Sequence, residues 1–176
     1  LTRRRMDPKR VARAGLIHVQ QGNLLFPEMT VAETLSIAPA AAGGRGDARE
    51  LTDEALARFP RLTERMGSKC RFLSGGERQM LSVACGIIAA PRLLMLDEPT
   101  LGLSPKLRQE LAGAIRAIRG KGVPLIVVDQ DVEFLESLID TLYLFDHGRI
   151  SGRMAKADMP SHEEIMRMLF GAAALE

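Results

Sequence analysis

The sequence has no tryptophan, a single tyrosine and only two cysteines among its 176 residues. Two cysteines cannot build the disulfide framework of a small secreted domain, so Cys70 and Cys85 are expected to be reduced, cytosolic thiols. No apolar run approaches the roughly 18–20 residues that a membrane-spanning helix needs. Charge of one sign is not in excess either, because the formal net charge is only +2. The overall charge therefore gives no indication of a nucleic-acid binder. The composition is that of a globular chain long enough for one domain with a hydrophobic core.

The two ends of the chain differ from its interior. Residues 1–14 are basic and carry no interleaved aromatic side chains, which favours a solvated helix or loop face over an arm that binds nucleic acid or lipid. No methionine precedes Leu1, and AAALE at residues 172–176 resembles a junction with a purification tag. We therefore interpret the last five residues as a vector-derived tail and leave them out of the fold prediction.

The interior alternates between buried strands and helices. Short apolar runs predict strands at 16–19, 93–96 and 125–128, and the run at 93–96 is typical of a parallel strand covered on both faces. Residues 40–49, rich in alanine and glycine, are predicted to be a mobile connection. Capping patterns, apolar spacing and closing proline or glycine residues predict helices at 30–39, 51–59, 74–90, 132–139 and 161–170, with a hairpin at 142–150. A further helix is predicted from residue 104 to either Gly120 or Gly122. This order predicts an α/β fold in which a mostly parallel sheet is flanked by helices, with a helical subdomain inserted at 30–90.

One predicted helix start has the features of an anion site. Ser74 and Glu77 form a capping box, while Gly75 and Gly76 leave the first backbone amides of the helix uncovered. Bare N–H groups at a helix N-terminus attract anions, and phosphate is the usual one. A helix cap with two turn glycines explains the same residues, so this pattern alone leaves both interpretations open.

Two neighbouring carboxylates follow the strand at 93–96. Ligands of open α/β sheets bind at the carboxyl ends of the strands, which is where Asp97 and Glu98 lie in the sequence. An aspartate there can hold Mg²⁺ through its water shell, and the adjacent glutamate can polarise a water molecule for attack on a phosphoryl group. Two solvated carboxylates at the start of a loop are the alternative interpretation.

Taken together, the two motifs resemble those of ATP-binding cassette (ABC) ATPases. LSGGE at 73–77 is similar to the signature motif of this family, and LLMLDE at 93–98 is similar to its Walker B strand with the catalytic glutamate. The resemblance covers residues 8–170 and implies a partial P-loop NTPase fold with ATP and Mg²⁺ as cofactors. It gives Glu98 a catalytic role and Asp97 a role in holding Mg²⁺ and nucleotide. It also assigns nucleotide contacts to Ser74, Gly75, Gly76 and Glu77.

Two glutamines match further positions of the family. Gln21 stands at the Q-loop position, which implies contact with Mg²⁺ and the attacking water and a link to the transmembrane partner. Gln130 stands at the switch position, where many members carry histidine. A glutamine there can hydrogen-bond a phosphate but cannot become charged. Gln130 and the loop LGLSP at 101–105, which lacks the usual aspartate, are similar to branched-chain amino acid transporter ATPases.

The phosphate-binding loop of the family, G-x-x-x-x-G-K-S/T, occurs nowhere in the sequence. In the family this loop precedes the Q-loop, so the resemblance implies a truncated chain. The amides and lysine of the loop cradle the phosphates, so we expect the chain alone to bind ATP weakly and to be inactive. The strand that precedes this loop is expected to be missing beside the strand at 93–96. Its absence would leave open hydrogen-bonding edges and an apolar flank, which self-association would cover.

The resemblance implies an ATP-binding subunit of an ABC transporter, with amino-acid import as the expected activity. A second nucleotide-binding subunit and transmembrane permease subunits would be its partners, at the cytoplasmic face of the inner membrane and without nucleic acid. Residues 1–29 would be a remnant of the core, 30–90 the signature subdomain and 91–171 the Walker B and switch core. A non-enzymatic module that completes a partner's site is the alternative. A DNA-repair or chromosome-maintenance ATPase ranks last, since the sequence has no zinc motif or long heptad repeat.

Overall fold

The computed structural model describes residues 7–22, 24–41, 43–44 and 46–170. The chain divides into two compact units, Leu1–Gln130 and Asp131–Glu176, and each is described by itself. The first unit carries a parallel sheet and most of the helices, and the second carries a hairpin and two short helices.

The first unit is built on a three-stranded parallel sheet. Its strands are β1 (Leu16–Val19), β2 (Leu93–Asp97) and β3 (Leu125–Val128), in the order β1-β2-β3. All three strands were predicted, and the α/β fold with a parallel sheet is confirmed. Parallel neighbours require long connections, and here each connection contains helices.

The central place of β2 corrects one prediction. Both edges of β2 are hydrogen-bonded, on one side to β1 and on the other to β3. The expectation that a strand is missing beside residues 93–96 is therefore wrong. Within the described chain, the sheet edges without a neighbouring strand are the outer edges of β1 and β3.

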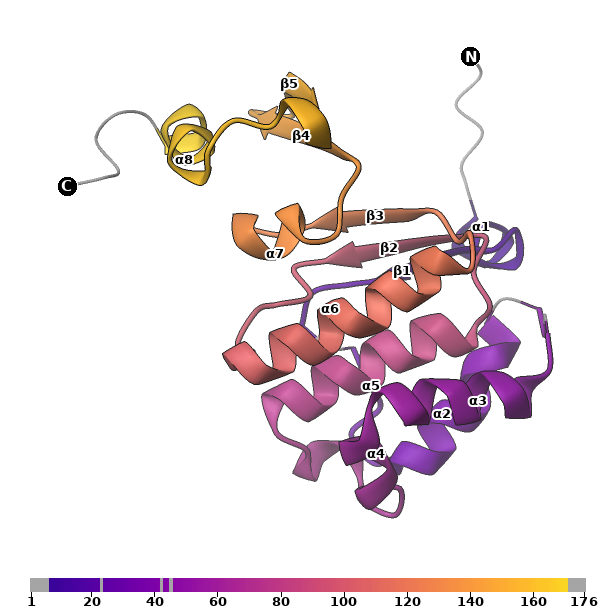
Figure 1. Ribbon diagram of the computed structural model, residues 1–176. Helices are drawn as coiled ribbons and strands as arrows, with labels where there is room; N and C mark the ends of the chain where they lie inside the picture. The colour runs from indigo at the N-terminus through magenta and orange to yellow at the C-terminus, as the bar shows by residue number, and fades with distance from the viewer. Residues whose placement is uncertain (1–6, 23, 42, 45, 171–176) are drawn as a thin grey trace. The chain divides into compact units, whose positions relative to one another are not determined.

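Two helices cover one face of the sheet. In Figure 1, α5 (Gly75–Ile88) and α6 (Pro105–Gly120) run side by side along it, and α5 contacts both β1 and β2. On this face Leu94 and Leu96 are fully buried. On the opposite face Leu93 and Met95 of β2 are half-buried, and Ile126 and Val128 of β3 are exposed. The strand at 93–96 is therefore fully covered on one face and partly covered on the other.

A second helical layer lies beyond α5. It consists of α2 (Val31–Ala41), α3 (Ala48–Arg58) and α4 (Pro60–Glu64), all of which contact α5 (Figure 1). The predicted capping box at the start of α2 is present, because the backbone N–H of Thr30 donates to Glu33 at 2.8 Å and that of Glu33 donates to the Thr30 hydroxyl at 3.2 Å. The predicted connection at 40–49 is shorter than expected, since both its ends are helical.

Two prolines act differently from their predicted roles. Pro39 lies inside α2, which continues to Ala41. Pro60 does not merely stop α3, because it also begins α4 at a first-turn position where its missing N–H costs nothing. The remaining short elements of this unit are α1 (Pro8–Arg13), capped by Asp7, and the 3-10 turn η1 (Cys70–Phe72).

The second unit contains the predicted hairpin. Its strands β4 (Thr141–Asp146) and β5 (Arg149–Ala155) are antiparallel, and His147 and Gly148 form the turn with positive φ angles of 45° and 77°. Such a two-residue turn matches the twist of the strands. The other elements are α7 (Val132–Glu136), shorter than predicted, η2 (Lys156–Asp158) and α8 (His162–Phe170). None of the described helices combines the length and the apolar character needed to cross a bilayer.

Candidate functional site

Glu98 lies directly after β2 in a strained backbone conformation. Its φ angle is 45°, in the left-handed region that side chains other than glycine rarely adopt. Its backbone N–H donates to the carbonyl of Val128 at 2.7 Å, so the ends of β2 and β3 are joined at this point. Strained residues that the surrounding structure holds in place are concentrated at functional sites, which makes Glu98 the centre of the candidate site.

Two glutamine side chains converge on the Glu98 carboxylate. Gln21 Nε2 donates to Oε2 at 2.6 Å, and Gln130 Nε2 donates to Oε1 at 3.0 Å. Gln21 follows β1 and Gln130 follows β3, so the parallel sheet brings together three residues that are far apart in the sequence. We call this arrangement the amide clamp. The sequence predicted its three members. The catalytic roles of Glu98 and Gln130 and the nucleotide- and Mg²⁺-binding role of Gln21 remain predictions.

The helix start predicted as an anion site forms as expected. Ser74 caps α5: its hydroxyl accepts the Glu77 backbone N–H at 3.2 Å, and the Glu77 carboxylate accepts the Ser74 N–H at 2.7 Å. The two intervening glycines differ in their surroundings. A methyl group added to Gly76 would lie 2.6 Å from Leu107, whereas one added to Gly75 would meet nothing within 4 Å. Gly76 therefore serves packing, and Gly75 leaves open space in front of the helix.

Comparison with known proteins identifies the family. The model of the family described as "ABC transporter" matches residues 2–101, which is more than half of the chain. The chain belongs to the ABC transporter family. The high-affinity branched-chain amino acid transport ATP-binding protein BraG of Pseudomonas aeruginosa is 35% identical over 80% of this chain and 60% of its own length. The probable branched-chain amino acid transport ATP-binding protein LivF of Archaeoglobus fulgidus is 32% identical over 94% of this chain and 70% of its own length.

Solved structures support the same assignment at the level of fold. An ATP-binding subunit of an ABC transporter matches this chain with a TM-score of 0.75 at 23% identity, covering 95% of this chain and 67% of that one. The resemblance to branched-chain amino acid transport ATP-binding proteins is also confirmed. This member of the ABC family thus spans about 60% of the length of BraG.

A salt bridge that the sequence did not reveal holds the start of α5 in this ABC chain. Arg65, at the end of α4, donates through Nε to Glu77 Oε1 at 3.2 Å. The pKa of Glu77 is lowered, first by the hydrogen bond from the Ser74 backbone and to a smaller extent by Arg65. No spacing rule links residues twelve positions apart in an irregular segment, so the sequence did not predict that Arg65 contacts Glu77.

The lowered pKa of Glu77 predicts a specific dependence of stability on pH. A carboxylate whose folded pKa is depressed adds stability above its unfolded value, near 4.5, and this contribution is lost as pH falls through the folded pKa. Glu77→Gln keeps the capping hydrogen bond but cannot ionise, so we expect a smaller loss of unfolding free energy between about pH 5 and pH 3 than in the unchanged chain. Urea unfolding followed by circular dichroism at several pH values measures this difference. Glu64→Gln, on the exposed surface of α4, is the matched control, and an equal effect of both variants would contradict the assignment.

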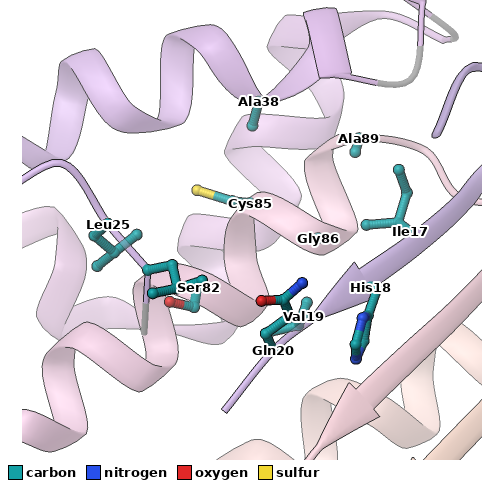
Figure 2. Close-up of a pocket in the computed structure, with 11 residues that line it drawn as sticks. Ile17, His18, Val19, Gln20, Leu25, Ala38, Ser82, Cys85, Gly86 and Ala89 are labelled. Carbon is teal, nitrogen blue, oxygen red and sulfur yellow. The ribbon is translucent and has the colours of Figure 1, made fainter. Parts of the chain in front are cut away.

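A cavity of about 340 Å³ opens beside the loop that carries Gln21. Figure 2 shows Ala38 of α2 and Cys85 of α5 on one side of it, and Ile17 and His18 of β1 on the other. Burial raises the pKa of the Cys85 thiol to about 12, so this group does not act as a nucleophile. The lining is largely apolar, which suits an apolar group better than a charged ligand.

Proposed function

We propose that this chain provides the Walker B, switch and signature parts of an ATP-binding subunit in an ABC importer for amino acids. In such a subunit ATP binding and hydrolysis are coupled to transport. The names of the related BraG and LivF proteins support the substrate class, since both are described as branched-chain amino acid transport proteins. Residues 30–90 would act as the signature subdomain, and residues 1–29 and 91–171 as the core around it.

The amide clamp is the observation that carries this proposal. A carboxylate at the end of the central strand, held by amides from the two neighbouring strands, is oriented toward the sheet edge where ligands of α/β folds bind. Glu98 would accept a proton from the attacking water, and Gln130 would hydrogen-bond the terminal phosphate. Bound ATP supplies the phosphoanhydride bond that is broken.

The residues at this edge fit Mg²⁺ and a part of ATP. Gln21 directs its N–H group toward Glu98, which leaves its amide oxygen for another partner. This oxygen and the Asp97 carboxylate are oxygen donors of the kind that Mg²⁺ prefers, so these two residues would hold the ion, which would offset the negative charge of the phosphates. The sequence has no glycine-rich phosphate loop, so the cradle for the phosphates would come from residues outside it.

Two kinds of protein partner follow from the proposal. The open helix start at Gly75 would contact nucleotide held by a second nucleotide-binding subunit, because bare amides at a helix N-terminus favour phosphate. The cavity between β1, α2 and α5 would receive an apolar side chain of a permease subunit. With these partners the chain would be peripheral to the cytoplasmic face of the inner membrane.

The alternative is a non-enzymatic module that completes a partner's site. The intact capping box of α5 favours it, because this helix start needs no phosphate loop in the same chain. In this case Glu98 would have no chemical role, whereas Ser74 and Gly75 would keep theirs.

Titration with a fluorescent ATP analogue and Mg²⁺ tests how much of the nucleotide site this chain supplies. We expect no saturation in the micromolar range, where binding would amount to about −8 kcal/mol. Hydrolysis should stay at the background rate, because positioning and phosphate contacts are lost together. Micromolar binding with turnover that Glu98→Gln abolishes would contradict the predicted inactivity.

Mixing experiments separate the proposal from its alternative. A full-length relative with a disabled signature motif but an intact phosphate loop should regain ATP turnover when this chain is added. Gly75→Asp should abolish the recovery without a steric clash, since it places a carboxylate in front of the open amides. If Glu98→Gln reduces the recovery, Glu98 takes part in catalysis. If it leaves the recovery unchanged, this chain contributes only its α5 helix start to the nucleotide that the relative's phosphate loop holds, as the alternative requires. Absence of any recovery of ATP turnover would contradict both the proposed ATP-binding subunit and the site-completing module.

A further inference from the structure

Two loops leave the carboxyl ends of β2 and β3 and remain joined beyond the sheet. The last regular contact between them is the hydrogen bond from the Glu98 backbone N–H to the Val128 carbonyl. One residue further along each loop, the chain continues with Pro99 and Asp129. Side chains must hold the loops together from this point on, because the strand ladder has ended.

Asp129 and Thr100 make that connection. The Thr100 hydroxyl lies 2.7 Å from Asp129 Oδ1 and 2.8 Å from Oδ2, and the Thr100 backbone N–H donates to Oδ2 at 3.0 Å. Thr100 is only 7% exposed. Hydrogen bonds to an ionised carboxylate are shorter and stronger than neutral ones, and removing a partner from a buried site leaves the other group unsatisfied. We call this contact the Thr100–Asp129 latch.

The latch adjoins both members of the clamp that follow β2 and β3. Thr100 comes two residues after Glu98, and Asp129 directly precedes Gln130. The clamp hydrogen bond from Gln130 Nε2 to Glu98 Oε1, at 3.0 Å, therefore closes a small ring with the latch. Two short loops tied at two points have far fewer conformations than two loops tied at one.

We infer that Thr100 and Asp129 are positioning residues that keep Gln130 in hydrogen-bonding contact with Glu98. The inference rests on the proposed function, in which Glu98 accepts a proton from the attacking water and Gln130 hydrogen-bonds the terminal phosphate. It also explains how Glu98 is held at a positive φ angle, since a strained residue persists only where its surroundings over-determine it. The latch would make the loops after β2 and β3 move as one body.

Nuclear magnetic resonance of the nucleotide-free chain tests the latch directly. Side-chain amide protons that are hydrogen-bonded exchange with solvent more slowly than free ones, and Gln109 on the exposed surface of α6 provides the free reference. We expect the Gln130 amide protons to exchange on the order of ten times more slowly than those of Gln109, which corresponds to about 1.4 kcal/mol. Thr100→Val should bring the Gln130 rate to the reference rate, and Thr100→Ser, which keeps the hydroxyl, should restore slow exchange.

Two further variants keep the result decisive. Thr52→Val removes a threonine hydroxyl that bonds a backbone carbonyl in α3, and it should leave Gln130 unchanged. If Thr100→Val does not fold, Asp129→Leu carries the test, because it retains the size of the side chain and has no hydrogen-bond acceptor. A folded Thr100→Val or Asp129→Leu chain with slow Gln130 exchange would overturn the inference, because the Thr100–Asp129 contact would then not position Gln130.

The readout needs no nucleotide, so it separates this inference from the proposed function. Failure of the mixing experiment with an intact latch would contradict the proposed function and leave the positioning contact in place. Success there, with Gln130 exchange insensitive to Thr100, would contradict only the latch.

Discussion

Gly86→Leu is expected to lower the free energy of unfolding by about 3 kcal/mol, at the upper end of the range for overpacked cores. Gly86 lies where α5 crosses the sheet. A methyl group at this position would stand 2.7 Å from Val19 and 3.2 Å from Leu94, closer than side chains normally approach. A leucine would have to push the helix away from β1 and β2, and so disturb the strands that carry Gln21 and Glu98.

The matched control is a glycine in a helix without a close neighbour. Gly113 lies inside α6, and a methyl group there would meet nothing within 4 Å. Gly113→Ala should therefore stabilise the chain by roughly 0.5–1 kcal/mol, because alanine loses less conformational freedom in a helix. Urea unfolding followed by circular dichroism suits both variants, since the chain has no tryptophan for fluorescence. Equal stability of Gly86→Leu and the unchanged chain would show that α5 does not pack on the sheet as described.

Ile126→Lys with Val128→Lys is expected to convert a self-associating chain into a monomer. These residues on β3 are 44% and 57% exposed, although sheets of parallel strands are normally buried on both faces. The outer edge of β3 has no neighbouring strand within the described residues, so it also offers unpaired backbone groups. A second copy of the chain can cover both features at once, and two lysines would oppose such contact.

Light scattering measures this effect. The unchanged chain should show a mass of at least twice 19.3 kDa that rises with concentration, and the double variant should show the monomer mass. Ile37→Lys is the control, because Ile37 on α2 is similarly exposed at 46% and lies away from the sheet. A monodisperse monomer for the unchanged chain, or an equal effect of the control, would contradict self-association through β3.

Local sequence signals predicted the elements well where one physical cause dominated. β1 and β3 begin and end where the apolar runs do, and the capping boxes at Thr30, Ser74 and Ser161 all form. Proline was less informative, because the same ring can end one helix and begin the next, as Pro60 does. The order of the strands was mispredicted since it depends on contacts between distant segments, and no local pattern encodes which strand lies beside β2.

The candidate site shows the same division between local and distant information. Family motifs supplied Gln21, Glu98 and Gln130 as separate positions, and the sheet then placed their side chains on one carboxylate. Neither the Thr100–Asp129 latch nor the Arg65–Glu77 salt bridge was predicted. Threonine, aspartate and arginine are common in loops, and only the fold shows that these particular ones meet.

The left-handed backbone at Glu98 lowers local stability, whereas the side chain at the same position supplies the carboxylate of the proposed site. Glycine would adopt a φ angle of 45° without crowding and would relieve strain of the order of 1 kcal/mol. It would also remove the only carboxylate that the two glutamines hold. Directed evolution of more stable variants of this chain, with folding as the sole criterion, would therefore favour loss of the residue to which we assign the catalytic role. Such an experiment needs a second selection that retains the carboxylate at position 98.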